Sequence, residues 1–262
     1  MNNENKLLLE GELVLLVDHK DRRYLLTLET NSEFHSHSGF VSHNELIGKN
    51  DGVKIKSSGG LEYLVLRPTM SDVILKMPRS AQIFYPKDIG PILIGADIAP
   101  GHNVLESGVG SGALSIALLR AGANVTGIEL REDFAQRARK NVEAFFAEEL
   151  ERDRYTVLIG DAYEKITGSG YDRMVLDLPE PWRVIDHVEN CLRPGGIIVS
   201  YSPSITQVSQ LTDRLDRDKF VMTETQEILL RSWHIEGRAV RPDHRMVAHT
   251  GFITSTRYLG NE

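Results

Sequence analysis

A glycine-rich turn between an apolar segment and a helix-forming segment constrains the fold of this chain most strongly. Residues 104–107 read Val-Leu-Glu-Ser, residues 108–112 read Gly-Val-Gly-Ser-Gly, and residues 113–119 form an apolar run typical of a helix. Glycines in such a turn let the backbone pass close to a bound molecule, and the N-terminus of the helix offers free N–H groups and a partial positive charge. The pattern therefore predicts a strand–turn–helix unit that binds a nucleotide-like cofactor.

The alternation of strand and helix continues through the C-terminal two thirds of the chain. We expect strands at 103–106, 124–129, 156–159, 173–177 and 196–201. A long helix is expected over 132–150, with apolar residues at helical spacing on one face, and 193–196 should turn from a helix into the last strand. Residues 226–233 and 250–258 should form an antiparallel pair. The order predicts an α/β, Rossmann-like fold whose ligands bind at the carboxyl ends of parallel strands.

The N-terminal quarter of the chain has a different pattern. Short apolar runs separated by turn residues indicate strands and a hairpin, at 13–17, 24–28, 53–56 and 63–66. Prolines at 68, 78 and 86 then punctuate a connecting region. The expected division is therefore a small β-rich domain over 1–67, a connecting segment over 68–87 and a catalytic domain over 88–262.

Bulk properties exclude several classes of protein. The single cysteine, Cys191, rules out an intrachain disulfide and fits a reducing compartment. The first residues do not resemble a signal peptide, and no segment approaches the length of a membrane span. We therefore expect a cytoplasmic protein. Residues 33–37 with His43 lack the second, well-spaced ligand pair of a metal site, so we expect a polar loop there and no metal.

Charge is spread unevenly along the chain. The net charge of −7 argues against indiscriminate binding of nucleic acid, which needs Lys and Arg for phosphate contacts. Between residues 231 and 257, however, there are five arginines and two acids. A solvated loop with ion pairs and a surface that contacts RNA both explain this cluster. Its candidate RNA contacts are Arg231, Arg238, Arg241 and Arg245.

Acids near the ends of the expected strands bear on which cofactor the glycine turn fits. Glu129 can accept hydrogen bonds from both ribose hydroxyls, which suits NAD as well as S-adenosylmethionine (SAM). Glu106, two residues before Gly108, suits the cation-bearing methionyl end of SAM. Asp161 follows a strand and can accept from the adenine amino group. Together with the turn over 177–182, for which a dehydrogenase has no use, these acids favour SAM.

That turn reads Asp-Leu-Pro-Glu-Pro-Trp and points to methyl transfer onto a nucleobase. The methyl group of SAM is already activated, so the protein chiefly aligns the nucleophile with it and excludes water. A carboxylate that accepts from the exocyclic amine of the base would position the base and stabilise its developing positive charge. Asp177 is the candidate for this task. Trp182 either stacks on the substrate or anchors the turn, and Tyr85 either walls the base pocket or belongs to a linker turn.

These residues resemble the TrmI family of tRNA adenine-N1 methyltransferases, in particular its bacterial branch with an N-terminal β domain. The resemblance covers nearly the full length of the chain. Its motifs are the Glu-Phe-His at 33–35, Met-Pro-Arg at 77–79, Tyr-Pro-Lys-Asp at 85–88, the glycine turn, the turn at 177–182, Thr-Gln at 206–207, and residues 231–233, 240–244 and 249–252.

The resemblance implies a homotetramer that methylates N1 of the adenine at position 58 in the T-loop of tRNA, with SAM as the donor. It implies a SAM site lined by Ser111, Gly112, Ala113, Leu114, Glu129, Phe134 and Asp161, beside Glu106, Gly108 and Gly110. It places Asp177 at the methyl-transfer centre and Tyr85 beside the target base. For Phe134, packing in the core is the alternative. The acidic net charge is unusual for a tRNA enzyme, and a tetramer could offset it by pooling basic faces.

Two other functions stay open from the sequence. A protein isoaspartyl methyltransferase has a similar glycine turn, but it would not need the turn at 177–182 or the basic tail. A non-catalytic tRNA-binding partner, as in the eukaryotic relatives of the family, should have lost the glycine turn or the motif acids. This chain keeps them all: Gly108, Gly110, Gly112, Glu129, Asp161 and Asp177. Catalysis is therefore favoured.

Overall fold

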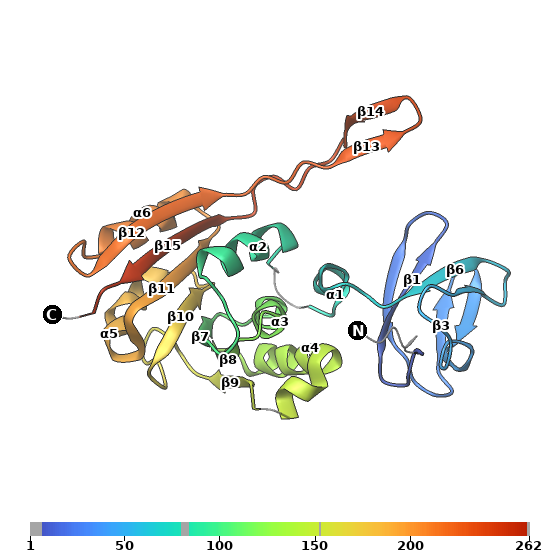
Figure 1. Cartoon of the computed structure of the whole chain (residues 1–262), viewed down its shortest axis with the longest axis horizontal. Helices are drawn as coiled ribbons and strands as arrows, with labels where there is room; N and C mark the ends of the chain where they lie inside the picture. The colour runs from blue at the N-terminus through green and yellow to red at the C-terminus, as the bar shows by residue number, and fades with distance from the viewer. Residues whose placement is uncertain (1–6, 80–83, 152, 261–262) are drawn as a thin grey trace. The chain divides into compact units, whose positions relative to one another are not determined.

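The computed structural model describes residues 7–79, 84–151 and 153–260, with the backbone alone for 147–151, and separates the chain into two compact units (Figure 1). Unit 1 comprises Met1–Pro78 together with Lys140–Ala147. Unit 2 comprises Arg79–Arg139 and Glu148–Glu262. The long helix α4 (Glu132–Glu151) contributes to both units.

Unit 1 is built on a four-stranded antiparallel sheet with the strand order β2-β1-β6-β5. Its strands are β1 (Leu13–Asp18), β2 (Arg23–Thr27), β5 (Lys54–Lys56) and β6 (Glu62–Leu66). Alternate residues of β1 and β6, among them Leu16, Tyr63 and Val65, are completely buried in one apolar cluster. The strands predicted for this region are confirmed, because their apolar alternation matches the period of a strand with one face in the core.

A hairpin formed by β3 (Glu33–Ser36) and β4 (Gly39–Ser42) precedes the short 3-10 helix η1 (His43–Glu45). The expectation of a polar loop at 33–37 is wrong for residues 33–36. Phe34 packs against Tyr24 and Tyr63, with ring centroids 5.1 and 5.9 Å apart, so the segment is held as a strand whose histidine points outward. Within the described parts of the chain, no group of three or more His, Cys, Asp or Glu side chains is arranged to hold a metal.

Helix α1 (Met70–Lys76) lies in the segment between the sheet of unit 1 and the boundary after Pro78. Thr69 caps it, because its hydroxyl accepts from the backbone N–H of Asp72 and the Asp72 carboxylate accepts from the backbone N–H of Thr69. Asp72 is also paired with Arg23 at 2.7 Å, which fastens α1 to β2.

Unit 2 contains a seven-stranded sheet with the order β12-β15-β11-β10-β7-β8-β9. Its strands are β7 (Asn103–Ser107), β8 (Asn124–Glu129), β9 (Tyr155–Ile159), β10 (Tyr171–Leu176), β11 (Leu192–Ser202), β12 (Phe220–Glu227) and β15 (Phe252–Tyr258). Strands β7 to β11 pair in parallel with one another. Strand β15 pairs in the antiparallel sense with both of its neighbours, β11 and β12. The chain order reverses at β7, whose neighbours are β10 and β8, and this is where an open α/β sheet binds its ligand.

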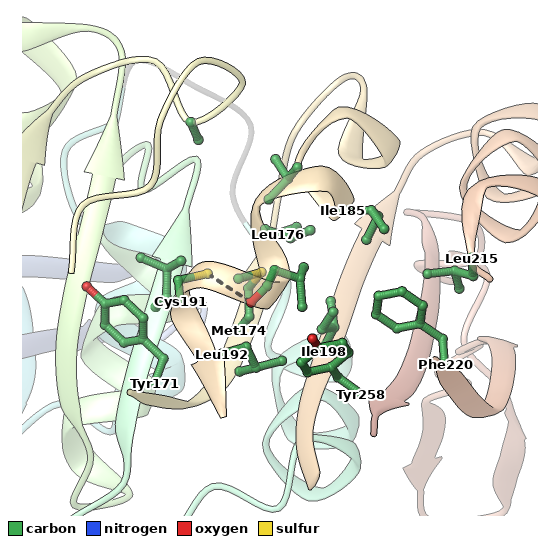
Figure 2. Close-up of a cluster of buried hydrophobic side chains, with 14 of the residues drawn as sticks. Tyr171, Met174, Leu176, Ile185, Cys191, Leu192, Ile198, Leu215, Phe220 and Tyr258 are labelled. Carbon is green, nitrogen blue, oxygen red and sulfur yellow. Dashed lines mark hydrogen bonds between the residues drawn. The ribbon is translucent and has the colours of Figure 1, made fainter. Parts of the chain in front are cut away.

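The helices of unit 2 alternate with these strands (Figure 1). They are α2 (Pro86–Gly95), α3 (Ala113–Arg120), α4, α5 (Val188–Cys191) and α6 (Ile205–Arg214), with the 3-10 turns η2 (Pro181–Arg183) and η3 (Ile185–His187). One apolar core runs from β10 across β11 to β12 and β15. Figure 2 shows part of it, including Met174, Ile198 and Phe220. Cys191 lies in this core, where its thiol donates to the carbonyl oxygen of Val188 at 3.6 Å.

Two sequence predictions for unit 2 need correction. The strand that pairs with β15 is 220–227 and not 226–233. It is an edge strand held by paired hydroxyls, such as Thr223 with Thr256 at 2.8 Å, so it lacks the apolar pattern that the prediction followed. The stretch 193–196, predicted as a turn, is an irregular part of β11: Tyr171 pairs with Leu192, and Arg173 already pairs with Ile197.

Residues 228–249, which we call the arm, leave β12 and return to β15 (Figure 1). Its outer part is the hairpin of β13 (Trp233–Glu236) and β14 (Ala239–Pro242). Opposed residues of an antiparallel pair share one face. Trp233 lies opposite Pro242 and Ile235 opposite Val240, so one face of the hairpin is entirely apolar.

Candidate active site

A cavity of about 510 Å³ opens at the carboxyl ends of β7, β8, β9 and β10. It brings together side chains and turns that are far apart in the sequence, from Ser107 to Glu180. The predicted site residues in its wall are Gly108, Gly110, Glu129, Phe134, Asp161 and Asp177. The wall also contains residues that the sequence did not single out, including Ser107, Arg131 and Tyr163. Their only sequence signal is that they follow or end the same strands.

The glycine turn is shaped by close approach of the backbone to its neighbours. Gly108 has a φ of +85°, and a Cβ there would collide with the carbonyl oxygen of Asp177. Gly112 has a φ of +82° and caps α3, where a Cβ would lie 3.2 Å from the backbone of Ala138. At Gly110, by contrast, no protein atom lies within 4 Å of the Cβ position. The turn is therefore tight against the protein on two sides and open at its middle.

Glu129 ends β8 with its carboxylate fixed by backbone donors. One carboxylate oxygen accepts from the N–H of Gly110 at 2.9 Å and the other from the N–H of Arg131 at 3.0 Å. A carboxylate has about four lone-pair positions, so both oxygens can accept further hydrogen bonds from a ligand. Glu129 is 7% exposed and lines the cavity. It is thus a preoriented acceptor for a pair of hydroxyl groups.

Asp161 and Phe134 form the neighbouring part of the wall. One carboxylate oxygen of Asp161 accepts from the N–H of Tyr163 at 2.8 Å. Phe134 lies in the first turn of α4, and the Arg131 guanidinium carbon lies 3.9 Å from its ring centroid. The buried positions of the predicted α4 segment start one residue later, at Ala135. Phe134 is therefore only partly buried, and it lines the cavity together with Asp161.

Asp177 follows β10 directly, at the edge of the cavity next to the glycine turn. Its backbone N–H donates to the carbonyl oxygen of Ser107 at 2.8 Å, which ties the two strand ends together. Its carboxylate accepts no hydrogen bond from the described residues. Burial, with a smaller contribution from the Glu129 charge, raises the pKa of Asp177 to about 7. The site thus contains an acid whose charged form has no hydrogen-bond partner among the residues that the structure describes.

Glu106 and the first turn of α3 lie behind the glycine turn. Glu106 is 1% exposed, and its carboxylate accepts from the Ser115 hydroxyl at 2.5 Å, which in turn accepts from the Tyr155 hydroxyl at 3.1 Å. Burial raises the pKa of Glu106 to about 8. Among the described residues, the cavity wall does not include Glu106, Ser111, Gly112, Ala113 or Leu114. Their predicted cofactor contacts stay predictions.

The raised pKa of Glu106 makes stability depend on pH. The folded chain keeps a proton on this carboxyl up to about pH 8, whereas the unfolded chain releases it near the ordinary value of 4.5. Folding stability is therefore lost as pH rises through this window. We expect the free energy of unfolding of the wild type, relative to Glu106→Gln, to fall by more than about 1 kcal/mol from about pH 5 to about pH 8. Urea unfolding of both proteins measures this difference, and parallel curves would contradict it.

Tyr85 and Trp182 lie outside the wall of this cavity. Tyr85 is the half-buried N-cap residue of α2. Trp182 lies in η2, half-buried, and packs against the apolar core of unit 2. This packing is the anchoring role that the sequence left open. Phe84, the residue before Tyr85, is buried, and its ring centroid lies 4.6 Å from that of Tyr201.

A buried ion pair at the start of α2, which the sequence did not indicate, holds the base of the arm. The Lys87 ammonium lies 2.7 Å from the Asp88 carboxylate, and the two side chains are 2% and 0% exposed. Lys87 also donates to the carbonyl oxygen of Ile228 and to the Thr250 hydroxyl, both at 2.6 Å. The Thr250 hydroxyl donates to the other Asp88 oxygen at 2.7 Å. Both ends of the arm are thereby fixed to the helix turn that carries Tyr85.

The four predicted RNA-contact arginines all lie on the arm and are exposed, away from the cavity wall. Arg241 lies opposite His234 on the hairpin face that does not carry Trp233. Arg238 occupies the turn between β13 and β14, and Arg231 and Arg245 flank the hairpin. The hairpin of the arm thus has one apolar face, and its other face carries Arg241 and His234 beside Glu236. In the described part of the chain, no helix has the length and apolar character needed to cross a membrane.

Comparison with known proteins places the chain in a family. Residues 62–257 match the model of the "tRNA methyltransferase complex GCD14 subunit", and residues 7–55 match the model of the TrmI N-terminal region. A Methanocaldococcus jannaschii tRNA (adenine(57)-N(1)/adenine(58)-N(1))-methyltransferase TrmI is 36% identical, over 93% of this chain and 94% of that protein. A Thermus thermophilus tRNA (adenine(58)-N(1))-methyltransferase TrmI is 35% identical, over 93% of this chain and 96% of that protein.

Solved structures of methyltransferases have a fold similar to that of this chain. A SAM-dependent O-methyltransferase from Thermotoga maritima superposes with a TM-score of 0.89 at 32% identity, over 97% of this chain and 96% of that one. The tRNA (m1A58) methyltransferase TrmI from Aquifex aeolicus gives 0.82 at 29% identity, over 98% of this chain and 100% of that one. The Rossmann-like methyltransferase fold predicted from the sequence is confirmed. The chain belongs to the GCD14/TrmI family of tRNA methyltransferases.

Proposed function

We propose that the protein transfers the methyl group of SAM to N1 of the adenine at position 58 in the T-loop of tRNA. The observation that carries this proposal is the Asp177 carboxylate directly after β10. It accepts no hydrogen bond from the described residues and lies in a cavity that also presents Glu129 and Asp161. The relatives named above act on tRNA adenine N1. A tRNA substrate makes the cytoplasm the expected compartment.

The order of the polar residues in the cavity wall supports SAM as the cofactor. Glu129 would accept from the ribose hydroxyls, Asp161 from the adenine amino group, and Phe134 would lie against the adenine ring. The glycine turn is open at its middle residue, Gly110, and this leaves room for the bound cofactor. SAM would supply an activated methyl group at a sulfonium.

Asp177 would act on the adenine through its exocyclic amine. N1 of adenine carries a lone pair, so no residue has to remove a proton before the methyl group is attacked. When the N1–methyl bond forms and the sulfonium–methyl bond breaks, positive charge moves onto the base. A nearby carboxylate, oriented before the reaction, stabilises that charge. Tyr85 would hold the base in place from the N-terminus of α2.

The Thermotoga maritima structure raises O-methylation as a second candidate. Methylation of a hydroxyl group requires a base that removes the hydroxyl proton. Asp177, with a pKa of about 7, would be the one acid of suitable pKa at the methyl-transfer position of the described cavity wall. The match of residues 62–257 to a tRNA methyltransferase model favours the nucleobase.

A homotetramer is the proposed assembly, and the arm supports it. An isolated two-stranded hairpin is only marginally stable in water, because its faces bury little apolar surface. Ile235 and Val240 are 73% and 60% exposed, and Trp233 is 58% exposed. A second copy of the chain would cover this apolar face and leave the exposed arginines of the arm for RNA.

Glu129 provides a test of the cofactor site. The change Glu129→Gln keeps the side-chain shape but removes the charge that strengthens hydrogen bonds from the ribose. Such charge-assisted hydrogen bonds contribute about 1.5–3 kcal/mol, so SAM affinity should fall about 10- to 100-fold. Isothermal titration of SAM measures the change. Asp133→Asn, an exposed acid paired with Arg131, is the matched control. Equal affinity in the two variants would refute the ribose assignment.

The arm arginines provide a test of tRNA binding. We expect Arg238→Ala combined with Arg245→Ala to weaken tRNA binding and to lower the slope of log affinity against log salt by about one for each phosphate that the variant no longer binds. SAM affinity should not change. Arg217→Ala, an exposed arginine after α6, controls for the loss of charge. A salt slope unchanged in the double variant would show that these residues do not contact phosphates.

The proposed function is tested by incubating the protein with SAM labelled in its methyl group and an unmodified tRNA transcript. The same transcript with guanine in place of the T-loop adenine is the control. Label should enter the first transcript and not the second. SAM binding without incorporation into either transcript would exclude tRNA as the acceptor.

A further inference from the structure

His249 contacts two hydrogen-bond acceptors at once. Its Nδ1 lies 2.8 Å from a carboxylate oxygen of Glu227, and its Nε2 lies 2.9 Å from the carbonyl oxygen of Pro203. A carbonyl and an ionised carboxylate accept hydrogen bonds and donate none, whereas a neutral imidazole donates from only one of its two nitrogens. Both contacts are hydrogen bonds only when both nitrogens carry a proton. The geometry therefore requires the charged imidazolium form of His249.

The charged and polar groups around His249 favour this form. The Pro203 carbonyl and the Glu227 carboxylate raise the pKa of His249 above its ordinary value of 6.5. Lys87, the cation that acts on the ring from α2, lowers this pKa by a smaller amount, and Lys87 is itself paired with Asp88. Because the pKa is raised, both hydrogen bonds are present below it, and one of them is lost as the pH rises through it.

The two acceptors of His249 belong to separate segments of unit 2. His249 is the last residue of the arm, Glu227 ends β12, and Pro203 directly follows β11. The next residue of the chain, Thr250, is bonded to the Lys87 ammonium at the start of α2. His249 thus fixes the end of the arm to the carboxyl end of β11, beside the point where Thr250 fixes it to α2.

The segment after Pro203 reaches the turn that carries Asp177. Ser204 caps α6 in a capping box with Gln207, whose side-chain oxygen accepts from the N–H of Ser204 at 3.1 Å. The side-chain nitrogen of Gln207 donates to the carbonyl oxygen of Pro179 at 2.8 Å, two residues after Asp177. A continuous series of hydrogen bonds and short chain segments therefore joins the end of the arm to this turn.

We propose that His249 is a positioning residue for methyl transfer, and that its imidazolium form joins the arm to the turn that carries Asp177. This inference rests on the proposed function, in which the arm contacts tRNA and Asp177 contacts the target base. Bound tRNA is then placed relative to Asp177 through the contacts of His249 and Gln207. Loss of the proton from His249 removes one of its two hydrogen bonds. The arm is then held less firmly, and methyl transfer slows at alkaline pH.

Two variants separate the proton of His249 from the contacts that it makes. His249→Gln keeps one donor for the Pro203 carbonyl but carries no charge at any pH. Glu227→Gln replaces the carboxylate with an amide that can donate to a neutral imidazole, so both contacts can form without the extra proton. His35→Gln is the matched control, because His35 also pairs with a carboxylate, that of Glu33 at 3.2 Å, but lies in unit 1.

The test is the single-turnover rate of tRNA methylation with saturating SAM, from about pH 6 to about pH 9. Each variant rate is divided by the wild-type rate at the same pH, which removes the titration of Asp177 that all these proteins share. The side chains of His249 and Glu227 are 47% and 37% exposed, so the effect should be that of a surface ion pair.

We expect His249→Gln to be about twofold to fivefold slower than the wild type at the acidic end and equal to it at the alkaline end. Glu227→Gln should match the wild type at the acidic end and exceed it by a similar factor at the alkaline end, because only the wild type loses a hydrogen bond there. His35→Gln should match the wild type throughout.

The outcomes separate this inference from the proposed function. A wild-type protein that transfers no methyl group to tRNA would overturn the proposed function, and the inference with it. An active wild type with a His249→Gln ratio that does not change with pH would overturn the role of His249 alone. NMR titration of isotope-labelled histidine measures the charge state directly, and the His249 signal is the one that His249→Gln lacks. A midpoint at or below pH 6.5 would also overturn the inference, because a neutral ring cannot donate to both acceptors.

Discussion

Replacing Asp177 with alanine is expected to slow methyl transfer to tRNA about 100- to 1000-fold, the usual effect of removing one preoriented electrostatic group from an active site. The physical reason is the absence of any protein partner for this carboxylate among the described residues. Its hydrogen-bonding capacity and its charge are free for the substrate. SAM affinity should change little, because the ribose and adenine contacts lie on β8 and β9. Single-turnover rates with saturating SAM measure the chemical step directly.

The isosteric change Asp177→Asn separates positioning from charge. The amide oxygen can still accept from the adenine amine but does not stabilise the positive charge, so we expect this variant to bind tRNA normally and to remain slow. The wild-type rate should also fall as pH drops below about 7, because the carboxyl then takes up a proton and loses the charge that stabilises the methylated base. Asp177→Asn should lose this inflection. A fast Asp177→Asn variant, or one that keeps the inflection, would contradict the assigned role.

The change Lys87→Met is expected to destabilise the protein by about 3–5 kcal/mol, because it leaves the Asp88 carboxylate buried without its counter-charge. Lys87 and Asp88 are 2% and 0% exposed, so water does not replace the missing partner. The variant also removes three hydrogen bonds of the ammonium, including the one to Ile228 at the base of the arm. Urea unfolding followed by circular dichroism measures the free energy of unfolding.

A double variant tests the cause of that destabilisation. A buried ion pair can often be replaced by apolar residues of similar volume at little cost, whereas a single removal is costly. Lys87→Met together with Asp88→Leu should therefore recover most of the stability that Lys87→Met loses. If the double variant is as unstable as the sum of the two single variants, the ion pair is not the source of the effect.

The glycine turn and the acids at the strand ends could be predicted from the sequence because strand, turn and acid are adjacent in the chain. Glu129 and Asp161 each come at the end of an apolar run, and parallel strands bring such ends to one edge of the sheet. The position of Phe134 could not be predicted, since its helical spacing fits both the core and the cavity. Phe134 lies one residue before Ala135, the first buried position of α4, and it lines the cavity.

Contacts between segments that are far apart in the chain could not be predicted from the sequence. Lys87 and Thr250 are 163 residues apart and meet only because the arm begins and ends beside α2. The strand predicted at 226–233 was misplaced, because its later residues, such as Leu229 and Leu230, are 57% and 54% exposed on the arm, and β12 ends at Glu227. For Glu106 the sequence did not show that its carboxylate is buried and bonded to Ser115, because that partner lies on the following helix and not on the strand.

The nucleoside produced in tRNA is the most direct test of N1 methylation by this protein. The transcript is incubated with the wild-type enzyme and SAM, digested to nucleosides and analysed by chromatography with mass spectrometry against authentic standards. The geometry predicts 1-methyladenosine from the T-loop adenine, absent with Asp177→Ala. N6-methyladenosine as the direct product would contradict it, because the amine that Asp177 is proposed to bind would then be the methyl acceptor.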